Sequence, residues 1–181
     1  EDFFKIKDKN WYKILSKCID RVFSISPRYI KTLKRIHNKE IIQIYNGIDT
    51  SVYQNLNLVR KKQILAVANF KKQKGLKFLI EGFSLFLKNN QKLNHYKLII
   101  AGKGILYNQI NEMINKKKLN DNIFLVGQKN RNQLIELYNN SEIFILPSIW
   151  EGFAKVLVEA MACGCKVIST KVDSAPIVLD N

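Results

Sequence analysis

The sequence predicts an α/β protein with a parallel sheet that carries helices on both faces. Short apolar runs alternate along the chain with segments of helical length, and this alternation is typical of parallel strands joined by helical crossovers. Several runs, such as Ile-Leu-Ala-Val-Ala at 64–68, are apolar throughout, as expected for strands that are buried on both sides. With 181 residues, of which 46% are hydrophobic, the chain can form one packed domain and part of another.

The strands are expected to be short, rich in Ile, Val, Leu or Phe, and bounded by Gly, Pro, Asn or Ser. They are 22–25, 41–45, 64–68, 97–101, 123–126, 143–146 and 166–169. The helices expected between them are 27–36, 76–89, 106–117, 132–139 and 155–163. Ser26 before Pro27 suits an N-cap followed by proline at the first helical position. Gly164 suits a left-handed cap at the end of the last of these helices.

A domain boundary is expected near residue 55. The Asn-Leu-Asn-Leu segment at 55–58 has no clear hydrophobic period, and a basic turn follows it before the strand at 64–68. Residues 1–55 would then be the end of one domain, and residues 56–181 most of a second.

The charge balance favours anionic partners. Lys and Arg outnumber Asp and Glu by 30 to 15, so the formal charge is +15. Such an excess attracts nucleic acid, phosphorylated ligands or an acidic membrane surface, and the plain alternative is a set of solvated lysines. No nucleic-acid-binding motif accompanies the basic clusters, and aromatic residues are not interleaved with them. We therefore expect no nucleic acid among the partners, although a basic nucleic-acid binder is one alternative to test.

Localisation is constrained by what the sequence lacks. There is no unbroken apolar run of about 18 residues, so no transmembrane helix is indicated, and no signal peptide is visible. The three cysteines, Cys18, Cys163 and Cys165, do not suggest a disulfide framework and favour a reducing cytoplasm. Metal binding by Cys163 and Cys165 would need a second Cys/His pair that the sequence does not offer. The expected location is the cytoplasm, with peripheral association at the inner face of an anionic membrane as a further hypothesis.

Ligands of open α/β sheets bind at the carboxyl ends of the strands, where loops lead into helix N-termini. The loop 69–75 joins a buried strand to a helix and contains Asn69, Lys71, Lys74 and Gly75. Its glycine allows a tight turn and its lysines can meet an anion next to the helix amides. By itself this pattern is also typical of an ordinary basic surface loop.

Two further loops follow later strands. Gly102-Lys103-Gly104 permits close backbone approach to a ligand, but it matches neither the P-loop nor the dinucleotide fingerprint. The stretch 146–164 places Glu151 and Glu159 around a turn that enters a helix. If both lay on one helix they would be ~12 Å apart along its axis, too far for the facing carboxylates of a retaining glycosidase, which need ~5 Å. They could grip opposite ends of an elongated ligand. The structural alternative for Glu159 is pairing with a lysine or exposure to solvent.

The segment 151–164, Glu-Gly-Phe-Ala-x4-Glu-Ala-Met-Ala-x-Gly, resembles the Glu-x7-Glu signature of family 4 of the retaining glycosyltransferases, whose two-domain fold is GT-B. Three other motifs of the family occur in the family's order. They are Tyr-Asn-Gly-Ile-Asp at 45–49, the loop ending in Lys-Gly at 67–75, and Phe-Ile-Leu-Pro-Ser at 144–148. The resemblance implies that residues 1–55 end an acceptor domain and that 56–181 form most of a Rossmann-like donor-binding domain, the C-terminal half of a GT-B fold.

The resemblance also implies roles for individual residues. Lys74 would bind the donor diphosphate, Glu151 the transferred sugar and Glu159 the ribose hydroxyls. The remaining expected contacts come from the loops and strand ends around the donor. They are Asn69, Lys71, Gly75, Val126, Gly127, Gly152, Phe153 and Ala154. No metal or other cofactor is expected, because cationic side chains and a helix N-terminus neutralise the leaving diphosphate.

Two positions depart from the family pattern. Many members carry Arg where this chain has Asn69, so either Lys71 or Lys72 supplies that charge or donor binding is weaker. Val178 stands where members commonly carry Glu. Most of the acceptor domain is not in this sequence, so we expect the chain to be inactive alone.

The expected function of the parent enzyme is that of a retaining glycosyltransferase of hexosyltransferase type in glycan or polysaccharide biosynthesis. The donor is expected to be a nucleotide-diphosphate sugar, with UDP favoured by the family's frequencies, and the acceptor a cell-surface glycan, lipid or polysaccharide. Two alternatives differ from this hypothesis. One is a GT-B nucleotide-sugar epimerase, which would lack the Glu-Gly-Phe block, and the other is a non-catalytic nucleotide-sugar-binding or partner-binding module.

Overall fold

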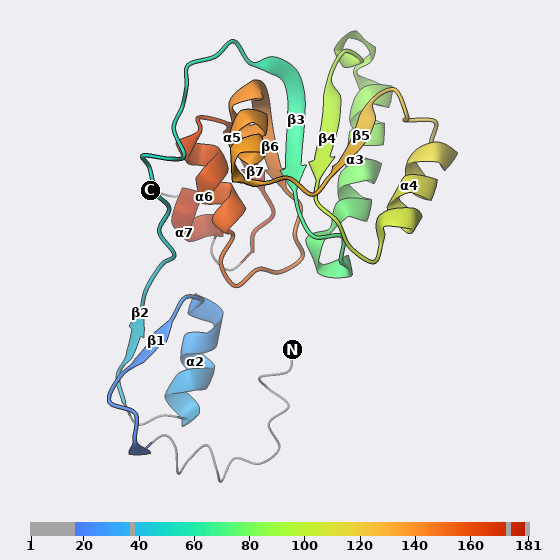
Figure 1. The fold of residues 1–181 in the computed structure, drawn as a ribbon. Helices are drawn as coiled ribbons and strands as arrows, with labels where there is room; N and C mark the ends of the chain where they lie inside the picture. The colour runs from blue at the N-terminus through green and yellow to red at the C-terminus, as the bar shows by residue number, and fades with distance from the viewer. Residues whose placement is uncertain (1–16, 37–38, 173–174, 180–181) are drawn as a thin grey trace. The chain divides into compact units, whose positions relative to one another are not determined.

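The computed structural model of the chain describes residues 17–36, 39–172 and 175–179 (Figure 1). The chain divides into two compact units, residues 1–46 and 47–181. The division thus lies between Asn46 and Gly47, whereas the sequence placed the domain boundary after residue 55. Residues 1–16 of the expected first domain lie outside the described residues. That the first unit belongs to an acceptor domain stays a prediction.

The described part of the first unit is one β-α-β motif. Strands β1 (Val22–Ser24) and β2 (Ile41–Gln43) pair in parallel, and helix α2 (Pro27–Ile36) connects them. Both strands are shorter than predicted. The expected N-cap hydrogen bond is absent here, because the buried hydroxyl of Ser26 has no partner among the described residues.

The second unit contains a five-stranded parallel sheet with the order β5-β4-β3-β6-β7. Each strand coincides with a predicted one to within a few residues. The strands are β3 (Lys61–Val67), β4 (Lys97–Ala101), β5 (Ile123–Gly127), β6 (Ser141–Leu146) and β7 (Lys166–Ser169). From β3 the chain adds strands first on one side and then, with β6, on the other. The direction therefore switches between β3 and β6, and the crevice at such a point is where ligands bind in open α/β sheets.

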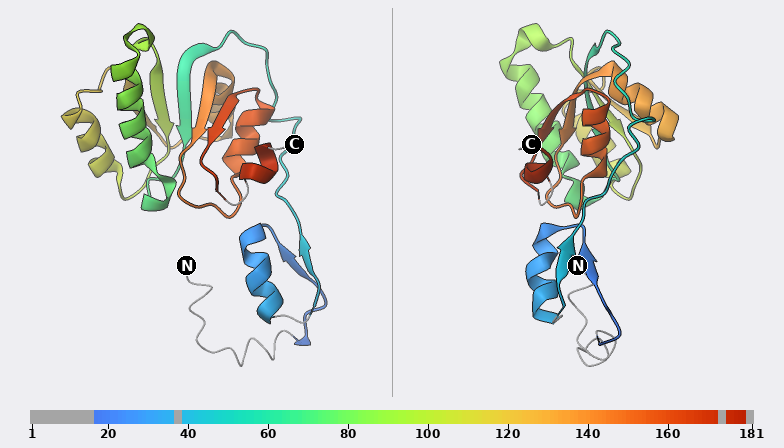
Figure 2. Two further views of the ribbon diagram at one scale, coloured as in Figure 1. Left: turned by 180° about the vertical axis from the view of Figure 1, so that it is seen from behind. Right: turned by 90° about the vertical axis from the view of Figure 1, so that its left-hand side faces the viewer.

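Helices cover both faces of this sheet (Figure 2). One face carries α3 (Leu76–Asn89) and α4 (Tyr107–Lys116), and the other carries α5 (Arg131–Asn140) and α6 (Lys155–Ala162). Two 3₁₀ turns, η2 (Lys72–Lys74) and η3 (Gln91–Leu93), and helix α7 (Ala175–Leu179) complete the unit. This confirms the predicted α/β fold with a parallel sheet between two helical layers.

Alternation along β3 explains why both layers pack. Ile64 and Ala66 lie in the apolar cluster beneath α3 and α4, whereas Leu65 lies in the cluster beneath α5 and α6. Successive side chains of a strand point to opposite faces, so a strand that is apolar throughout supplies both clusters. Burial of such side chains stabilises each helical layer by about 1.5–3 kcal/mol per large residue.

A buried guanidinium connects the segment before β3 to the elements that carry the site. Arg60 donates to the carbonyl oxygens of Tyr138 at 2.9 Å, Ser141 at 2.8 Å and Cys163 at 2.6 Å. These carbonyls lie at the end of α5, the start of β6 and the end of α6. Arg60 thereby satisfies acceptors that helix ends leave unpaired. The described residues include no helix that is long and apolar enough to span a membrane.

Candidate functional site

Three loops meet at the carboxyl ends of the central strands. Phe70 N donates to Lys103 O at 2.9 Å, which joins the loop after β3 to the loop after β4. Ile149 N donates to Gln73 O at 2.7 Å, which joins the loop after β6 to turn η2. The first loop is thus held from both sides at the point where the strand order reverses.

Glycines make this close approach possible. Gly75 has φ +63°, and a Cβ on it would lie 1.9 Å from the carbonyl oxygen of Pro147. Gly102 has φ +143°, and its Cβ would lie 1.9 Å from the carbonyl oxygen of Ala68. The Gly-x-Gly motif that the sequence left uninterpreted therefore packs two loops together. A side chain at either position would force backbone segments apart.

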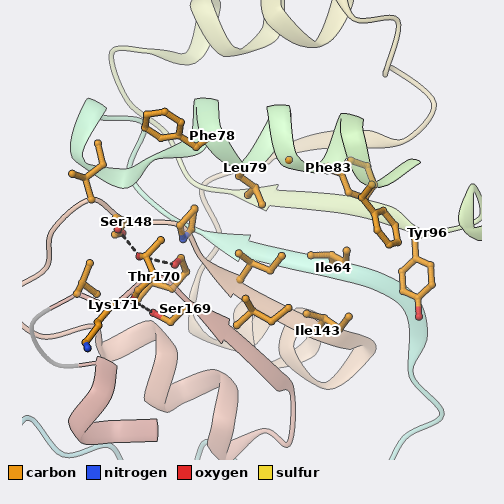
Figure 3. A pocket seen from close by; sticks show the side chains of 18 of the residues that line it. Ile64, Phe78, Leu79, Phe83, Tyr96, Ile143, Ser148, Ser169, Thr170 and Lys171 are labelled. Carbon is orange, nitrogen blue, oxygen red and sulfur yellow. Dashed lines mark hydrogen bonds between the residues drawn. The ribbon is translucent and has the colours of Figure 1, made fainter. Parts of the chain in front are cut away.

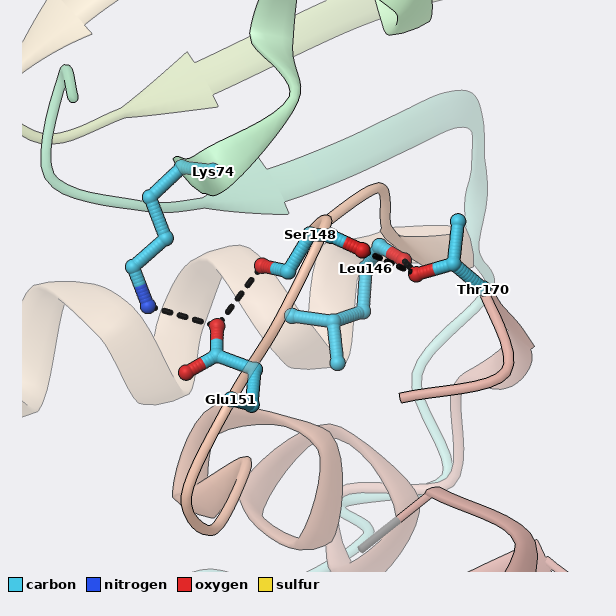
Figure 4. Close-up of polar contacts among 5 residues, drawn as sticks. All are labelled: Lys74, Leu146, Ser148, Glu151 and Thr170. Carbon is cyan, nitrogen blue, oxygen red and sulfur yellow. Dashed lines mark hydrogen bonds and ion pairs between the residues drawn. The ribbon is translucent and has the colours of Figure 1, made fainter. Parts of the chain in front are cut away.

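Lys74 and Glu151 meet in this junction (Figure 4). Lys74 Nζ lies 2.5 Å from Glu151 Oε1, and Ser148 Oγ donates to the same oxygen at 2.6 Å. Glu151 is 7% exposed, so a cation and a hydroxyl compensate most of its loss of solvent. No hydrogen bond between described residues reaches the second carboxylate oxygen, Oε2, which can accept one from a ligand. The sequence predicted both charged residues but not that they pair.

Ser148 is itself held from behind. Thr170 Oγ1 lies 2.5 Å from Ser148 O and 3.2 Å from Leu146 O, and Ser148 is 1% exposed. Thr170 follows β7, so a strand distant in sequence braces the loop that carries Glu151. Neither Ser148 nor Thr170 was among the predicted site residues. Ser148 lay in the Phe-Ile-Leu-Pro-Ser motif, where a serine three residues before a glutamate was the available signal, but no sequence pattern pointed to Thr170.

Glu159 occupies a different environment, inside helix α6. It is 6% exposed, and the hydroxyl of Tyr138 on α5 donates to its Oε2 at 3.0 Å. Burial and the neighbouring Glu159 carboxylate raise the pKa of Tyr138 far above its ordinary value. Neither structural alternative from the sequence holds, because Glu159 pairs with no lysine among the described residues and does not face solvent.

A hollow of about 200 Å³ opens at the carboxyl ends of β3, β4 and β5. Asn69 and Lys74 line it from one side, and Gln128 from the other. Gln128 was missed by the sequence argument, which stopped one residue earlier at Gly127. Gly127 accepts a hydrogen bond from Gly102 N at 2.8 Å, so this edge of the hollow is fixed by backbone contacts.

The other predicted residues divide between this hollow and its surroundings. Val126 and Gly127 end β5 beside the hollow, and Gly152, Phe153 and Ala154 form the turn that enters α6. Lys71 is exposed and lines a separate groove between α3 and α4, not the hollow. The structure thus brings Asn69 and Lys74 together and leaves Lys71 outside. Val178 on α7 packs against the apolar cluster beneath α6.

A second hollow, of about 830 Å³, lies between α3 and the exposed face of β6 and β7 (Figure 3). Its walls are mostly apolar side chains, with Ser148 and Thr170 at one end. It is larger than the hollow beside Lys74, but a wall of this kind does not suit a charged diphosphate. We therefore place the candidate site at the strand ends. Among the described residues, no group of three or more His, Cys, Asp or Glu is placed to hold a metal ion.

The family model for "Glycosyl transferases group 1" matches residues 34–181. The chain therefore belongs to this glycosyltransferase family. The uncharacterised glycosyltransferase MJ1059 of Methanocaldococcus jannaschii is 32% identical over 148 residues, which are 81% of this chain and 33% of that protein. A Campylobacter jejuni enzyme named N-acetylgalactosamine-N,N'-diacetylbacillosaminyl-diphospho-undecaprenol 4-alpha-N-acetylgalactosaminyltransferase is 30% identical over 82% of this chain and 36% of its own length.

The fold is also that of solved GT-B glycosyltransferases. S. aureus TarM, in a crystal structure that contains UDP, Fondaparinux and alpha-GlcNAc-glycerol, superposes with a TM-score of 0.78 at 21% identity. The match covers 92% of this chain and 33% of TarM. The chain thus spans about a third of the length of these relatives.

Proposed function

We propose that this chain is the donor-binding part of a retaining glycosyltransferase that transfers a sugar from a nucleotide-diphosphate sugar, with UDP as the nucleotide, to a glycan, lipid-linked or polysaccharide acceptor. The observation that carries the proposal is the Lys74–Glu151 pair, at 2.5 Å, in the crevice where the strand order reverses. The UDP in the TarM structure supports the choice of nucleotide.

The contacts fit a reaction in which negative charge develops on a diphosphate. Lys74 and the amides at the N-terminus of α6 would stabilise the leaving phosphate as the bond to the sugar breaks. Glu151 Oε2 would accept a hydrogen bond from a sugar hydroxyl, while Oε1 stays with Lys74 and Ser148. The acceptor hydroxyl would attack the same face of the sugar and pass its proton to the leaving phosphate. The balance of charge then requires no metal ion.

Calorimetric titration of the chain with UDP, GDP and ADP, without metal, tests the donor site. We expect saturable binding of UDP that weakens at least tenfold in Glu159→Ala, since a hydrogen bond to a charged group contributes about 1.5–3 kcal/mol. Lys62→Ala is the matched control, because its ion pair with Glu142 lies on the strand β3 side of the sheet away from the loops. Equal binding of UDP by the wild type and Glu159→Ala would contradict the proposed site.

Transfer itself requires the longer parent protein. Glu151→Gln in that protein should abolish transfer while nucleotide binding is retained, because the glutamine keeps the shape but not the charge that Lys74 and the sugar share. Unchanged transfer would exclude the catalytic role of Glu151. Nucleotide binding without transfer by the wild-type parent protein would favour the alternative, a non-catalytic binding module.

We also propose that the chain associates peripherally with an anionic membrane. A groove of about 800 Å³ between α3 and α4 has an apolar floor and a rim of lysines. Its lysines are Lys71, Lys72, Lys77, Lys116 and Lys117. None of them forms an ion pair with another described residue, and Phe78 beside them is 61% exposed. Unpaired lysines around exposed apolar side chains are typical of surfaces that bind anionic lipids.

Co-sedimentation with vesicles tests this association. Lys77→Glu, Lys116→Glu and Lys117→Glu combined should reduce binding to vesicles that contain anionic lipid, because each lysine near the surface contributes ~1 kcal/mol. The control carries the same change at Lys61, Lys88 and Lys92, which are exposed and outside the groove. Binding that ignores the anionic lipid content, or that the control lowers equally, would contradict the proposal.

A further inference from the structure

Glu159 is held by a phenol rather than by a cation. Tyr138 is fully buried, and its hydroxyl donates to Glu159 Oε2 at 3.0 Å across the contact between α5 and α6. A neutral phenol donates a single proton and leaves the negative charge of the carboxylate in place. A lysine at this position would instead neutralise the carboxylate and compete with a ligand hydroxyl.

A second phenol lies next to the same carboxylate. Tyr53, in the segment that leads from the unit boundary to β3, packs against the apolar cluster that contains Tyr138. Partial burial raises the pKa of Tyr53, and the Glu159 carboxylate adds to this effect. Tyr53 and Tyr138 come from parts of the chain that are far apart in sequence, so only the fold brings both to Glu159.

Glu159 therefore has a fixed orientation and an available acceptor. A carboxylate has about four lone-pair sites, and Tyr138 uses one of them on Oε2. A carboxylate that is held in this way does not have to reorganise when a hydroxyl binds, and preorganisation of this kind increases affinity by reducing the entropy lost on binding. The vicinal hydroxyls of a ribose are the donor chemistry that such a carboxylate recognises.

We propose that Tyr138 and Tyr53 are positioning residues that orient Glu159 for the ribose hydroxyls of the donor nucleotide, and the inference rests on the donor site proposed above. Tyr138 acts through its hydrogen bond to Oε2 and Tyr53 through its contact beside the carboxylate. Neither phenol needs to touch the nucleotide.

Comparing UDP with 2′-deoxy-UDP in calorimetric titrations of the chain tests the inference. Tyr138→Phe removes one hydroxyl and keeps the ring. The wild type should prefer UDP, and Tyr138→Phe should weaken UDP binding about tenfold while 2′-deoxy-UDP changes by less than about twofold. Tyr53→Phe should shift the same preference in the same direction by a smaller factor. Because Tyr53 is only partly buried, it provides a variant whose fold is less at risk.

Tyr96→Phe is the matched control. The hydroxyl of Tyr96 donates to Glu142 Oε2 at 2.8 Å, so the variant loses the same kind of phenol–carboxylate contact elsewhere in the unit, and its preference for UDP should not change.

Two results would overturn the inference while the donor site stands: equal weakening of both nucleotides in Tyr138→Phe, or an unchanged preference in both tyrosine variants while Glu159→Ala weakens UDP. An unchanged affinity in Glu159→Ala, or no UDP binding by the folded wild type, would overturn the donor site itself.

Discussion

Glu151 and Glu159 lie eight positions apart in one motif, but different chemistry holds them. Glu151 lies in a loop and is bound by the ammonium of Lys74 and the hydroxyl of Ser148, both on one oxygen. Glu159 lies within α6 and is bound by a phenol from the neighbouring helix. Both carboxylates are more than nine-tenths buried, so exposure alone does not distinguish them.

The difference teaches that the two ends of the site are supported by different parts of the fold. The Glu151 end depends on loops packed against one another at the switch between β3 and β6. The Glu159 end depends on the contact between two helices. Damage to the loop junction should therefore affect Glu151 first, and damage between α5 and α6 should affect Glu159 first.

Gly75→Ala should have the largest effect, on the Glu151 end. The left-handed backbone and the overlap with Pro147 O together predict a loss of roughly 3 kcal/mol in the free energy of unfolding. Urea denaturation measures this loss. Gly82→Ala is the control, since its Cβ would meet nothing within 4 Å in the interior of α3, and it should stabilise the chain by about 0.5–1 kcal/mol. Equal stability of the two variants would show that the loops are not packed as described.

Lys74→Met should come next, because it leaves Glu151 without its cation. Removing one partner of a buried pair costs about 3–5 kcal/mol, and the partial exposure of Lys74, 18% for its side chain, reduces our expectation to about 2 kcal/mol. The comparison is Lys62→Met, whose side chain is 56% exposed in its pair with Glu142, with an expected cost below about 1 kcal/mol. Chemical denaturation of both variants under identical salt conditions decides between a buried and a surface pair.

Ser148→Ala should have a smaller effect that separates the two ends functionally. Loss of the hydroxyl bound to Glu151 Oε1 predicts a cost of about 1.5 kcal/mol in stability. The preference for UDP over 2′-deoxy-UDP should stay at the wild-type value, because the change lies at the Glu151 end. Titration of the variant with both nucleotides checks this, and a lost preference would show that the two ends are coupled.

The smallest effect is expected in the alkaline pH dependence of stability. Burial and Glu159 raise the pKa of Tyr138 from its ordinary value of 10.0, so the folded state keeps a proton that the unfolded state releases. The stabilisation from this group is complete below pH 10 and decreases as the pH rises above it. Thermal unfolding between pH 9 and pH 11 should therefore show a shallower decline in Tyr138→Phe than in the wild type, to about one proton fewer in the slope. Identical slopes would mean that the phenol of Tyr138 is not buried.

Much of the fold was predictable because its signals are local. The apolar run at 64–68 and the four strands that follow it were placed to within a few residues, since hydrophobic periodicity reports burial directly. Strand order was not predictable, because the pairing of β3 with both β4 and β6 is a long-range property. The short helix α7 was missed, because five residues are too few to show a helical period.

The sequence by itself determined which chemical groups the site would contain. Lys74, Glu151 and Glu159 follow from their motifs, and the loops that carry them follow from the alternation of strands and helices. The tertiary structure alone decided which groups meet: Lys74 with Glu151, Thr170 with Ser148, and Tyr138 with Glu159. The physical reason is that each of these contacts joins elements distant in sequence, and packing of strands and helices in three dimensions, not local propensity, sets their distance.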